Sequence, residues 1–186
     1  NIFRKNDIRG FVTAEGELKG KINDPDISIN FNVDYPHFKG FRIREIWEGN
    51  IKNKNNQFVL NMKNIYSPIP SFLSMKFDSN LKLDSVSFSR VFNSNKGSIE
   101  VLKENNSYIW TADNFPLDEL ELSISNNQFD RIKGIINGSG SISSDQSYLD
   151  GRLAWSLGKY RNINLANSIF DFSFEDKFFY VNSSLY

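Results

Sequence analysis

The stretch Ile27-Ser28-Ile29-Asn30-Phe31-Asn32-Val33-Asp34-Tyr35 places large apolar side chains at every second position and polar ones between them. Successive side chains of a β-strand point to opposite faces of its sheet, so alternation sustained over this length predicts a half-buried strand. We therefore expect a strand here with one apolar face and one polar face.

The same period of two continues on both sides of this stretch. Helical spacing is confined to Phe115–Leu120, where an early proline and two acidic residues suit the first turn of a helix. The pattern predicts an all-β chain with at most one or two short helical turns. The alternating positions are Val12, Ala14, Gly16, Leu18, Gly20 and Ile22, then Leu73, Met75, Phe77, Leu81 and Leu83, then Leu149, Gly151, Leu153, Trp155 and Leu157, and finally Phe170, Phe172 and Phe174.

Polar clusters rich in asparagine separate these runs. Asparagine tolerates left-handed backbone angles, and such clusters are typical of turns between strands. No helical segment is long enough to connect parallel strands. We therefore expect an elongated antiparallel β meander. Clear examples of the clusters are residues 53–56, 93–97, 103–106 and 143–146.

Two parts of the chain share one pattern. Residues 16–66 and 134–186 each contain a glycine-spaced strand, a polar turn, an alternating strand, an aromatic corner and two further strands. We interpret residues 1–186 as one repetitive sheet, with sub-repeats at about 10–66 and 134–186 and connecting strands at 67–133. Repetition favours an elongated, stacked architecture. The start at Asn1 and the lack of an apolar run long enough to span a bilayer lead us to expect an internal fragment of a longer chain.

The composition argues against nucleic-acid binding, against thiol and zinc sites, and against catalysis. The 22 basic and 22 acidic residues cancel, which disfavours binding to nucleic acid. The absence of cysteine removes disulfides, thiolate nucleophiles and cysteine-ligated zinc. We predict a protein that is not an enzyme and that uses no cofactor and no metal.

Four features could carry chemistry, and each has a simpler interpretation. Gly134, Gly138 and Gly140 lack the Lys-Ser or Lys-Thr pair of a phosphate-binding loop and favour a strand that bends or bulges. His37, the only histidine, follows a proline at a strand corner and favours a surface or turn position. Paired acids favour solvated turns: Asp24 with Asp26, and Asp118 with Glu119. Three tryptophans could form a sugar-stacking platform, although burial is the default role of Trp155: Trp47, Trp110 and Trp155.

The segment Trp110-Thr111-Ala112-Asp113-Asn114-Phe115-Pro116-Leu117-Asp118-Glu119-Leu120 resembles a recurring signature of the TamB family. A glycine-rich strand follows it at residues 134–140, and then comes Leu149-Asp150-Gly151-Arg152-Leu153, as is common in that family. The resemblance extends in pattern over about residues 10–186, and it is closest to cyanobacterial members and their chloroplast inner-envelope relatives.

This resemblance implies a fold and a function. TamB and other AsmA-like proteins form long β-sheet half-pipes, called a β-taco, with an apolar inner groove. They are thought to bridge two membranes, to move phospholipids between them and, as a translocation and assembly module with an Omp85-type outer-membrane protein, to support outer-membrane biogenesis. The implied location is the periplasm or an intermembrane space, with anchor and Omp85-contacting regions that are absent from this sequence. The family has no catalytic residues to carry over.

The residues alone point toward the same kind of groove. A sheet with one apolar face must bury that face against a second sheet, against itself or against a ligand. About twelve strands at a spacing of roughly 4.8 Å would form a trough on the order of 55 Å long, enough for phospholipid acyl chains. The residues that we predict to line the groove are Val12, Leu18, Ile22, Ile27, Ile29, Phe31, Val33, Leu153, Trp155, Phe170 and Phe172.

Two other interpretations remain open at this point. One is a compact β-sandwich or jelly-roll module that binds carbohydrate through an exposed tryptophan. The other is a structural stalk of an adhesin type, whose apolar face is filled by its own side chains. The assignment of faces is also ambiguous between Phe77 and Leu81, because one bulge exchanges the two faces of a strand.

Overall fold

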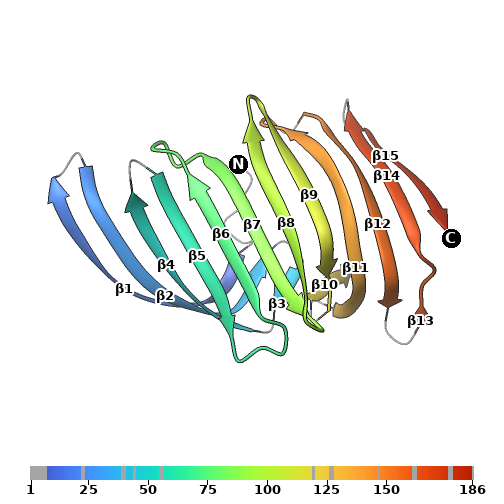
Figure 1. Ribbon diagram of the computed structural model, residues 1–186, viewed down its shortest axis with the longest axis horizontal. Coiled ribbons are helices and arrows are strands. Elements are labelled where there is room, and N and C mark those ends of the chain that lie inside the picture. Colours follow the sequence, from blue (N-terminus) through green and yellow to red (C-terminus); the bar gives the residue numbers. More distant parts are fainter. Residues whose placement is uncertain are drawn as a thin grey trace.

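The computed structural model describes residues 8–21, 24–38, 41–43, 45–54, 57–118, 120–125, 128–145, 147–160, 163–175 and 178–185. Over these residues the chain forms fifteen strands of one antiparallel sheet and no helix. The sheet is elongated and curled into a half-pipe, with β1 and β15 at its two extremes (Figure 1). The predicted all-β antiparallel meander is therefore confirmed.

The strands are β1 (Ile8–Lys21), β2 (Asp24–Phe38), β3 (Phe41–Ile43), β4 (Ile46–Lys54), β5 (Gln57–Ile65), β6 (Ser71–Phe77), β7 (Leu83–Phe92), β8 (Asn95–Glu104), β9 (Ser107–Pro116), β10 (Leu120–Ser125), β11 (Gln128–Ser143), β12 (Leu149–Tyr160), β13 (Ile163–Asn164), β14 (Ser168–Glu175) and β15 (Phe178–Leu185).

Most long strands pair with the next long strand along the chain, and three short strands lie outside this run. The main path of the sheet skips β3, β10 and β13, so that β2 pairs with β4, β9 with β11 and β12 with β14. Each skipped strand instead pairs with one end of a long neighbour: β3 with β2, β10 with β11, and β13 with β12.

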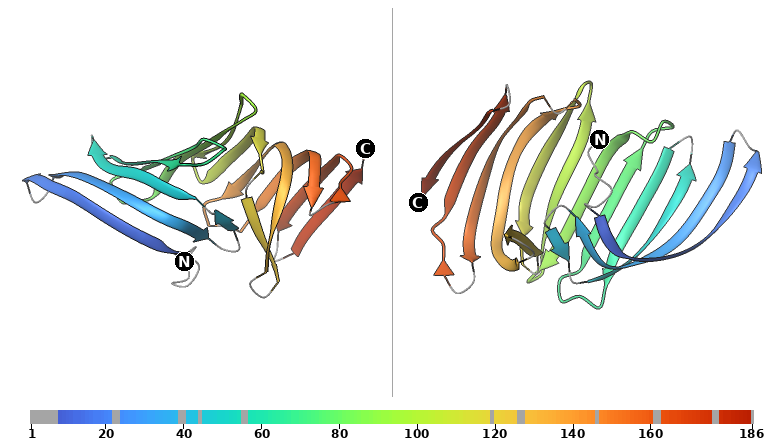
Figure 2. Two further views of the ribbon diagram at one scale, coloured as in Figure 1. Left: turned by 90° about the horizontal axis from the view of Figure 1, so that it is seen from below. Right: turned by 180° about the vertical axis from the view of Figure 1, so that it is seen from behind.

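A strap made of β3 and β10 closes the half-pipe at one end of its strands. β10 pairs with β11 on one side and with β3 on the other, and β3 pairs in turn with β2. The strap therefore connects β2 with β11. It lies behind the lower ends of β7, β8 and β9 in the view of Figure 1, and Figure 2 shows it from two other sides. We call this the closed end of the half-pipe and the opposite strand ends the open end.

The buried core lies at the closed end. Trp47 is 3% exposed and Phe115 is 1% exposed, and Phe88 lies between them with ring centroids 6.1 Å from Trp47 and 5.1 Å from Phe115. In the sheet, β5 and β6 separate β4 from β7, which in a flat sheet would put Trp47 about 14 Å from Phe88. The rings meet because the sheet is strongly concave on the face that carries them.

Strands β1–β5 and β11–β15 share one strand order, although β3 pairs also with β10 whereas β13 is paired with β12. In β1–β5 and again in β11–β15, a long hairpin is followed by a short strand that folds back on the second strand, and then by a second hairpin. Tyr35 and Leu157 have positive φ values of 52° and 51° near the same end of β2 and β12. Gly10 and Gly134, with φ values of 150° and 124°, both lie at register shifts, in β1 and in β11.

The structure differs from the sequence expectation at the predicted helical turn, residues 115–120, and it explains the ambiguous faces after Phe77. The segment expected to start a helix ends β9, and a turn follows in which the Leu120 amide donates to the Leu117 carbonyl, 3.1 Å away. The ambiguous phase after Phe77 results from a register shift between Lys76 and Phe77, which pairs Phe77 with Leu83. The predicted asparagine turns include Asn93 and Asn105, both with positive φ.

Candidate functional site

The pairing register places alternate residues of all the long strands on one face. Residues directly opposite each other in antiparallel strands lie on the same face, so a chain of such pairs traces a row across the sheet. A first row crosses the sheet from β1 to β15 without interruption. It consists of Ala14, Phe31, Gly49, Met62, Leu73, Phe88, Ile99, Ala112, Gly138, Leu153, Phe170 and Ser183.

A second row runs beside the first, two residues along each strand toward the open end. Its only residues that are not hydrophobic are glycines. It consists of Gly16, Ile29, Ile51, Leu60, Met75, Val86, Val101, Trp110, Gly140, Gly151, Phe172 and Val181. We call the face that carries the two rows the apolar face.

The residues predicted from the sequence all lie on the apolar face, apart from one that falls outside the described residues, Ile22. Ile29, Phe31, Leu153, Phe170 and Phe172 belong to the two rows. The others share the face through their pairing with row neighbours or with one another: Val12 with Val33, Leu18 with Ile27, and Trp155 with Ile136.

Exposure of the apolar face changes along the strands and toward the sheet edges. Most large side chains of the rows are partly exposed, whereas the fully buried ones belong to the closed end. On the edge strands, Val12 and Leu18 of β1 are 63% and 72% exposed, and Phe179 and Leu185 of β15 are 60% and 73% exposed. Among the described residues, no second sheet covers this face. A contiguous, partly exposed apolar surface is typical of a site that contacts another molecule.

The sequence reasoning missed the middle of the apolar face. Strands β4 to β9 contribute Ile51, Leu60, Met62, Val86 and Val101, none of which was predicted to line the groove. The signal was present in Phe58, Leu60 and Met62, which alternate along β5. Their face could be fixed only by the register to β4 and β6.

Glycines in the rows let aromatic rings lie flat against the sheet. Trp110 stacks with Phe172, with ring centroids 6.0 Å apart and planes 9° from parallel. A Cβ added to Gly140 would lie 2.7 Å from the Trp110 Nε1, and one added to Gly151 would lie 2.8 Å from the Phe172 Cζ. These two glycines pair regularly, so the predicted bend or bulge is found at Gly134 and not at Gly140.

We expect Gly140→Val to destabilise the chain by about 1–3 kcal/mol, because an added side chain would collide with Trp110 and with the backbone of Gly151. Thermal unfolding followed by circular dichroism would measure the change. Ser139→Val is the matched control, because Ser139 is exposed on the opposite face of the same strand. Equal melting temperatures for the two variants would contradict the close contact between Trp110 and Gly140.

A polar network crosses the closed end beneath the buried rings. The Glu45 carboxylate accepts hydrogen bonds from Asn64 Nδ2 (2.8 Å) and from Ser67 Oγ (2.6 Å). Asn64 also accepts from the Ser71 amide at 2.7 Å, and Ser71 Oγ accepts from Arg90 Nε at 3.2 Å. Arg90, 1% exposed, donates through Nη1 to the Pro116 carbonyl at 2.7 Å. The network runs from Glu45, the residue before β4, through β5, β6 and β7 to the end of β9.

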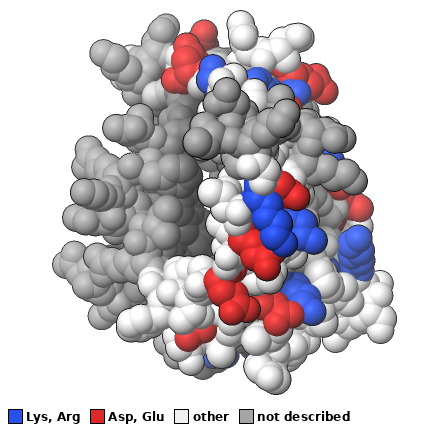
Figure 3. Space-filling view, turned by 90° about the vertical axis from the view of Figure 1, so that its left-hand side faces the viewer, with Lys and Arg blue, Asp and Glu red and all other residues white. Residues whose placement is uncertain are grey.

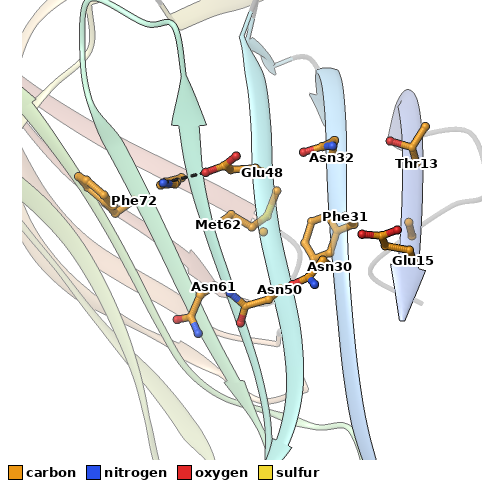
Figure 4. A pocket seen from close by; sticks show the side chains of 13 residues that line it. Thr13, Glu15, Asn30, Phe31, Asn32, Glu48, Asn50, Asn61, Met62 and Phe72 are labelled. Carbon is orange, nitrogen blue, oxygen red and sulfur yellow. Dashed lines mark ion pairs between the residues drawn. The ribbon is translucent and has the colours of Figure 1, made fainter. Parts of the chain in front are cut away.

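The opposite face is polar and has a different character. A pocket of about 770 Å³ lies across β1, β2, β4, β5 and β6, and it is lined by polar residues of this face together with four first-row residues, Ala14, Phe31, Gly49 and Met62 (Figure 4). Glu48 pairs there with Lys63 at 2.7 Å, and Asn61 accepts a hydrogen bond from Ser74 Oγ at 2.9 Å. Acidic and basic side chains are interspersed over the described surface in Figure 3, so neither sign of charge dominates that surface.

Shifted pKa values occur in turns and not on the apolar face. Hydrogen bonds from the hydroxyls of Ser143 and Ser147 and from the Ser147 amide lower the pKa of Asp145 to about 2. The backbone amide of Lys82 is the main cause of the lowered pKa of Asp78. Both carboxylates cap exposed turns. Within the described ranges, no group of acidic or histidine side chains is placed to hold a metal ion.

Comparison of the chain with protein-family models, with curated proteins and with solved structures gives no match. A search of the described residues for a helix long and apolar enough to cross a membrane also finds none.

Proposed function

We propose that this chain is a segment of a groove that holds phospholipids by their acyl chains and lets them move along the sheet. The observation that carries the proposal is the pair of unbroken rows, which gathers the apolar residues of successive strands on one partly exposed concave face. The TamB-like signature at residues 110–120 supports a place in a protein that spans an envelope and supports outer-membrane biogenesis, in a periplasm or intermembrane space.

The chemistry of the face suits hydrocarbon and not a polar ligand. In the second row the only side-chain group that could hydrogen-bond a head group is the Trp110 indole Nε1–H; the other members are aliphatic residues, Met75, Phe172 and glycines. Each methylene removed from water contributes about 0.8 kcal/mol, so burying about ten of them would supply roughly 8 kcal/mol before the cost of ordering the lipid. This attraction is nearly the same at each step along a row, which favours sliding over tight binding at one point.

The single sheet differs from the arrangement that a β-sandwich requires. A sandwich buries its apolar faces between two sheets, whereas here all strands belong to one sheet. The three tryptophans also lie on the apolar face: Trp47 in the buried core, Trp110 in the second row, and Trp155 beside the first row. The polar face therefore has no tryptophan on which a sugar could stack.

We expect the purified chain to carry phospholipid that native mass spectrometry detects as bound mass and that organic extraction releases. The physical reason is the exposed apolar area on β1 and β15, together with the partly exposed rows between them, which water solvates poorly.

The control is the same preparation after delipidation on a hydrophobic resin, to which a fluorescent phospholipid is then added. Recovery of fluorescence in the protein fraction would show that the site refills. A gently purified chain that carries no lipid and takes up none after delipidation would contradict the proposal.

A further inference from the structure

A third row of paired residues crosses the sheet on the polar face. On each strand its member lies between the first-row and the second-row residue, so it points away from the apolar face. No member of this row is hydrophobic, and we call the row the polar track. It consists of Glu15, Asn30, Asn50, Asn61, Ser74, Ser87, Glu100, Thr111, Ser139, Arg152, Asp171 and Asn182.

The pocket of about 770 Å³ is a groove along one side of the polar track. The track from β1 to β5 forms one wall, and a neighbouring row of paired residues forms the other, as the two lines of side chains in Figure 4 show. The groove crosses five neighbouring strands, and four strand spacings of about 4.8 Å give it a length of roughly 19 Å. The second wall consists of Thr13, Asn32, Glu48, Lys63 and Phe72.

The groove contains hydrogen-bonding groups that the protein itself does not use. Within the described residues, the side-chain amides of Asn30, Asn32 and Asn50 have no hydrogen-bond partner. Asn61 uses its Oδ1 to accept from Ser74 Oγ at 2.9 Å. Each amide side chain presents a donor and an acceptor close together. A ligand with adjacent hydroxyl groups could therefore bind these amides without displacing an internal hydrogen bond.

Phe72 adds an exposed aromatic ring to one end of the groove. The side chain is 49% exposed, although β6 is paired on both sides, with β5 and with β7. Its exposure therefore does not depend on an edge of the sheet. A flat apolar ring beside polar groups is suited to the C–H face of a sugar ring, whose hydroxyls then reach the polar groups.

A second hollow borders the same track in the other half of the molecule. It measures about 460 Å³ and crosses β11, β12, β14 and β15, which correspond in strand order to β1, β2, β4 and β5. The track members Arg152 and Asp171 lie there with Nε and Oδ1 3.7 Å apart, and Tyr180, 57% exposed, also lines the hollow. Both hollows thus combine the polar track with an exposed aromatic side chain.

We propose that the polar track binds an extended glycan that lies across the strands. Its side chains favour this class of ligand. Three acidic residues and one basic residue disfavour a polyanion, and the track lacks the apolar anchors that protein interfaces use at their centres. A sugar unit of an extended glycan advances by about one strand spacing, so that successive units would meet successive strands. The site is independent of the proposed lipid groove because it uses the opposite face.

Isothermal titration calorimetry with cellotetraose and with chitotetraose, two straight β-linked tetrasaccharides, tests the proposal. We expect saturable binding of at least one of them, and we expect Asn50→Ala and Phe72→Ala each to weaken it at least five-fold, a loss of about 1 kcal/mol. The Asn50 amide has no hydrogen-bond partner among the described residues, so its removal breaks no internal hydrogen bond there. Circular dichroism checks that both variants remain folded.

The matched control is Leu102→Ala, which we expect to leave binding unchanged. Leu102 is 50% exposed on the polar face, like Phe72, but it lines neither hollow. No binding of either tetrasaccharide at millimolar concentrations would overturn the proposal, as would equal weakening by Phe72→Ala and Leu102→Ala. Phospholipid content is measured in the same samples. If Asn50→Ala lost sugar and phospholipid together, the glycan would not occupy a separate site and the proposal would also fail.

Discussion

Phe115→Ala is expected to lower the free energy of unfolding by about 3–5 kcal/mol, the range found when a fully buried aromatic ring is removed. Phe115 is 1% exposed, its ring contacts Phe88, and the Arg90 guanidinium lies over the ring with its Cζ 5.9 Å from the centroid. The truncation would leave a cavity beside a buried cation. Chemical denaturation followed by circular dichroism measures the change.

The control for this variant is Phe72→Ala. Phe72 is 49% exposed and lies on the polar face, so we expect its truncation to change stability by less than about 1 kcal/mol. If the two truncations cost the same, the closed end is not the stabilising core of the sheet. We further expect Phe115→Ala, studied below its melting temperature, to retain lipid binding, because the first and second rows extend from the closed end across the whole sheet.

The sequence predicted the face of the sheet well because one physical rule decides it. Alternation of apolar and polar residues fixes which side chains share a face within a strand, and Ile29 and Phe31 in β2, like Phe170 and Phe172 in β14, needed nothing more. Between strands the rule fails wherever a bulge intervenes. The register shift at Phe77 hid the contribution of β7 and β8, which only the pairing to β6 and β9 reveals.

The strap could not be predicted for a different reason. β3 is a strand of three residues, Phe41–Ile43, which is too short to show a period, and its partner β10 lies far away in the chain. The polar network from Glu45 to Arg90 was missed for a related reason, because its members come from neighbouring strands and only the register of the sheet places them side by side. Such long-range contacts leave no local pattern in the sequence.

The glycines show a third limit. From the sequence, Gly134, Gly138 and Gly140 favoured a bend or bulge, and register shifts do lie at Gly134 and next to Gly138, but not at Gly140. In the structure, Gly140 and Gly151 instead make room for the stacked rings of Trp110 and Phe172. Sequence spacing cannot distinguish the two roles, because the rings come from β9 and β14, neither of which contains these glycines.

Phe31→Arg is expected to reduce bound phospholipid at least ten-fold while the neighbouring substitution Asn30→Arg leaves it unchanged. Phe31 lies in the first row, where a Cβ added to Gly49 would lie 2.7 Å from the end of its ring, whereas Asn30 is exposed on the opposite face of the same strand. Both substitutions add one positive charge to β2. They differ only in whether that charge meets hydrocarbon or water, and an ion in contact with acyl chains loses solvation worth several kcal/mol.

The measurement is phospholipid per protein, by mass spectrometry after gentle purification and by uptake of a fluorescent phospholipid after delipidation. Circular dichroism of both variants separates loss of lipid from loss of fold, since the row is broken at a partly exposed position that β1 and β4 still hold by backbone pairing. If both variants keep their lipid, the ligand does not lie on the apolar face. If both lose it while remaining folded, binding depends on net charge and the two faces are not functionally distinct.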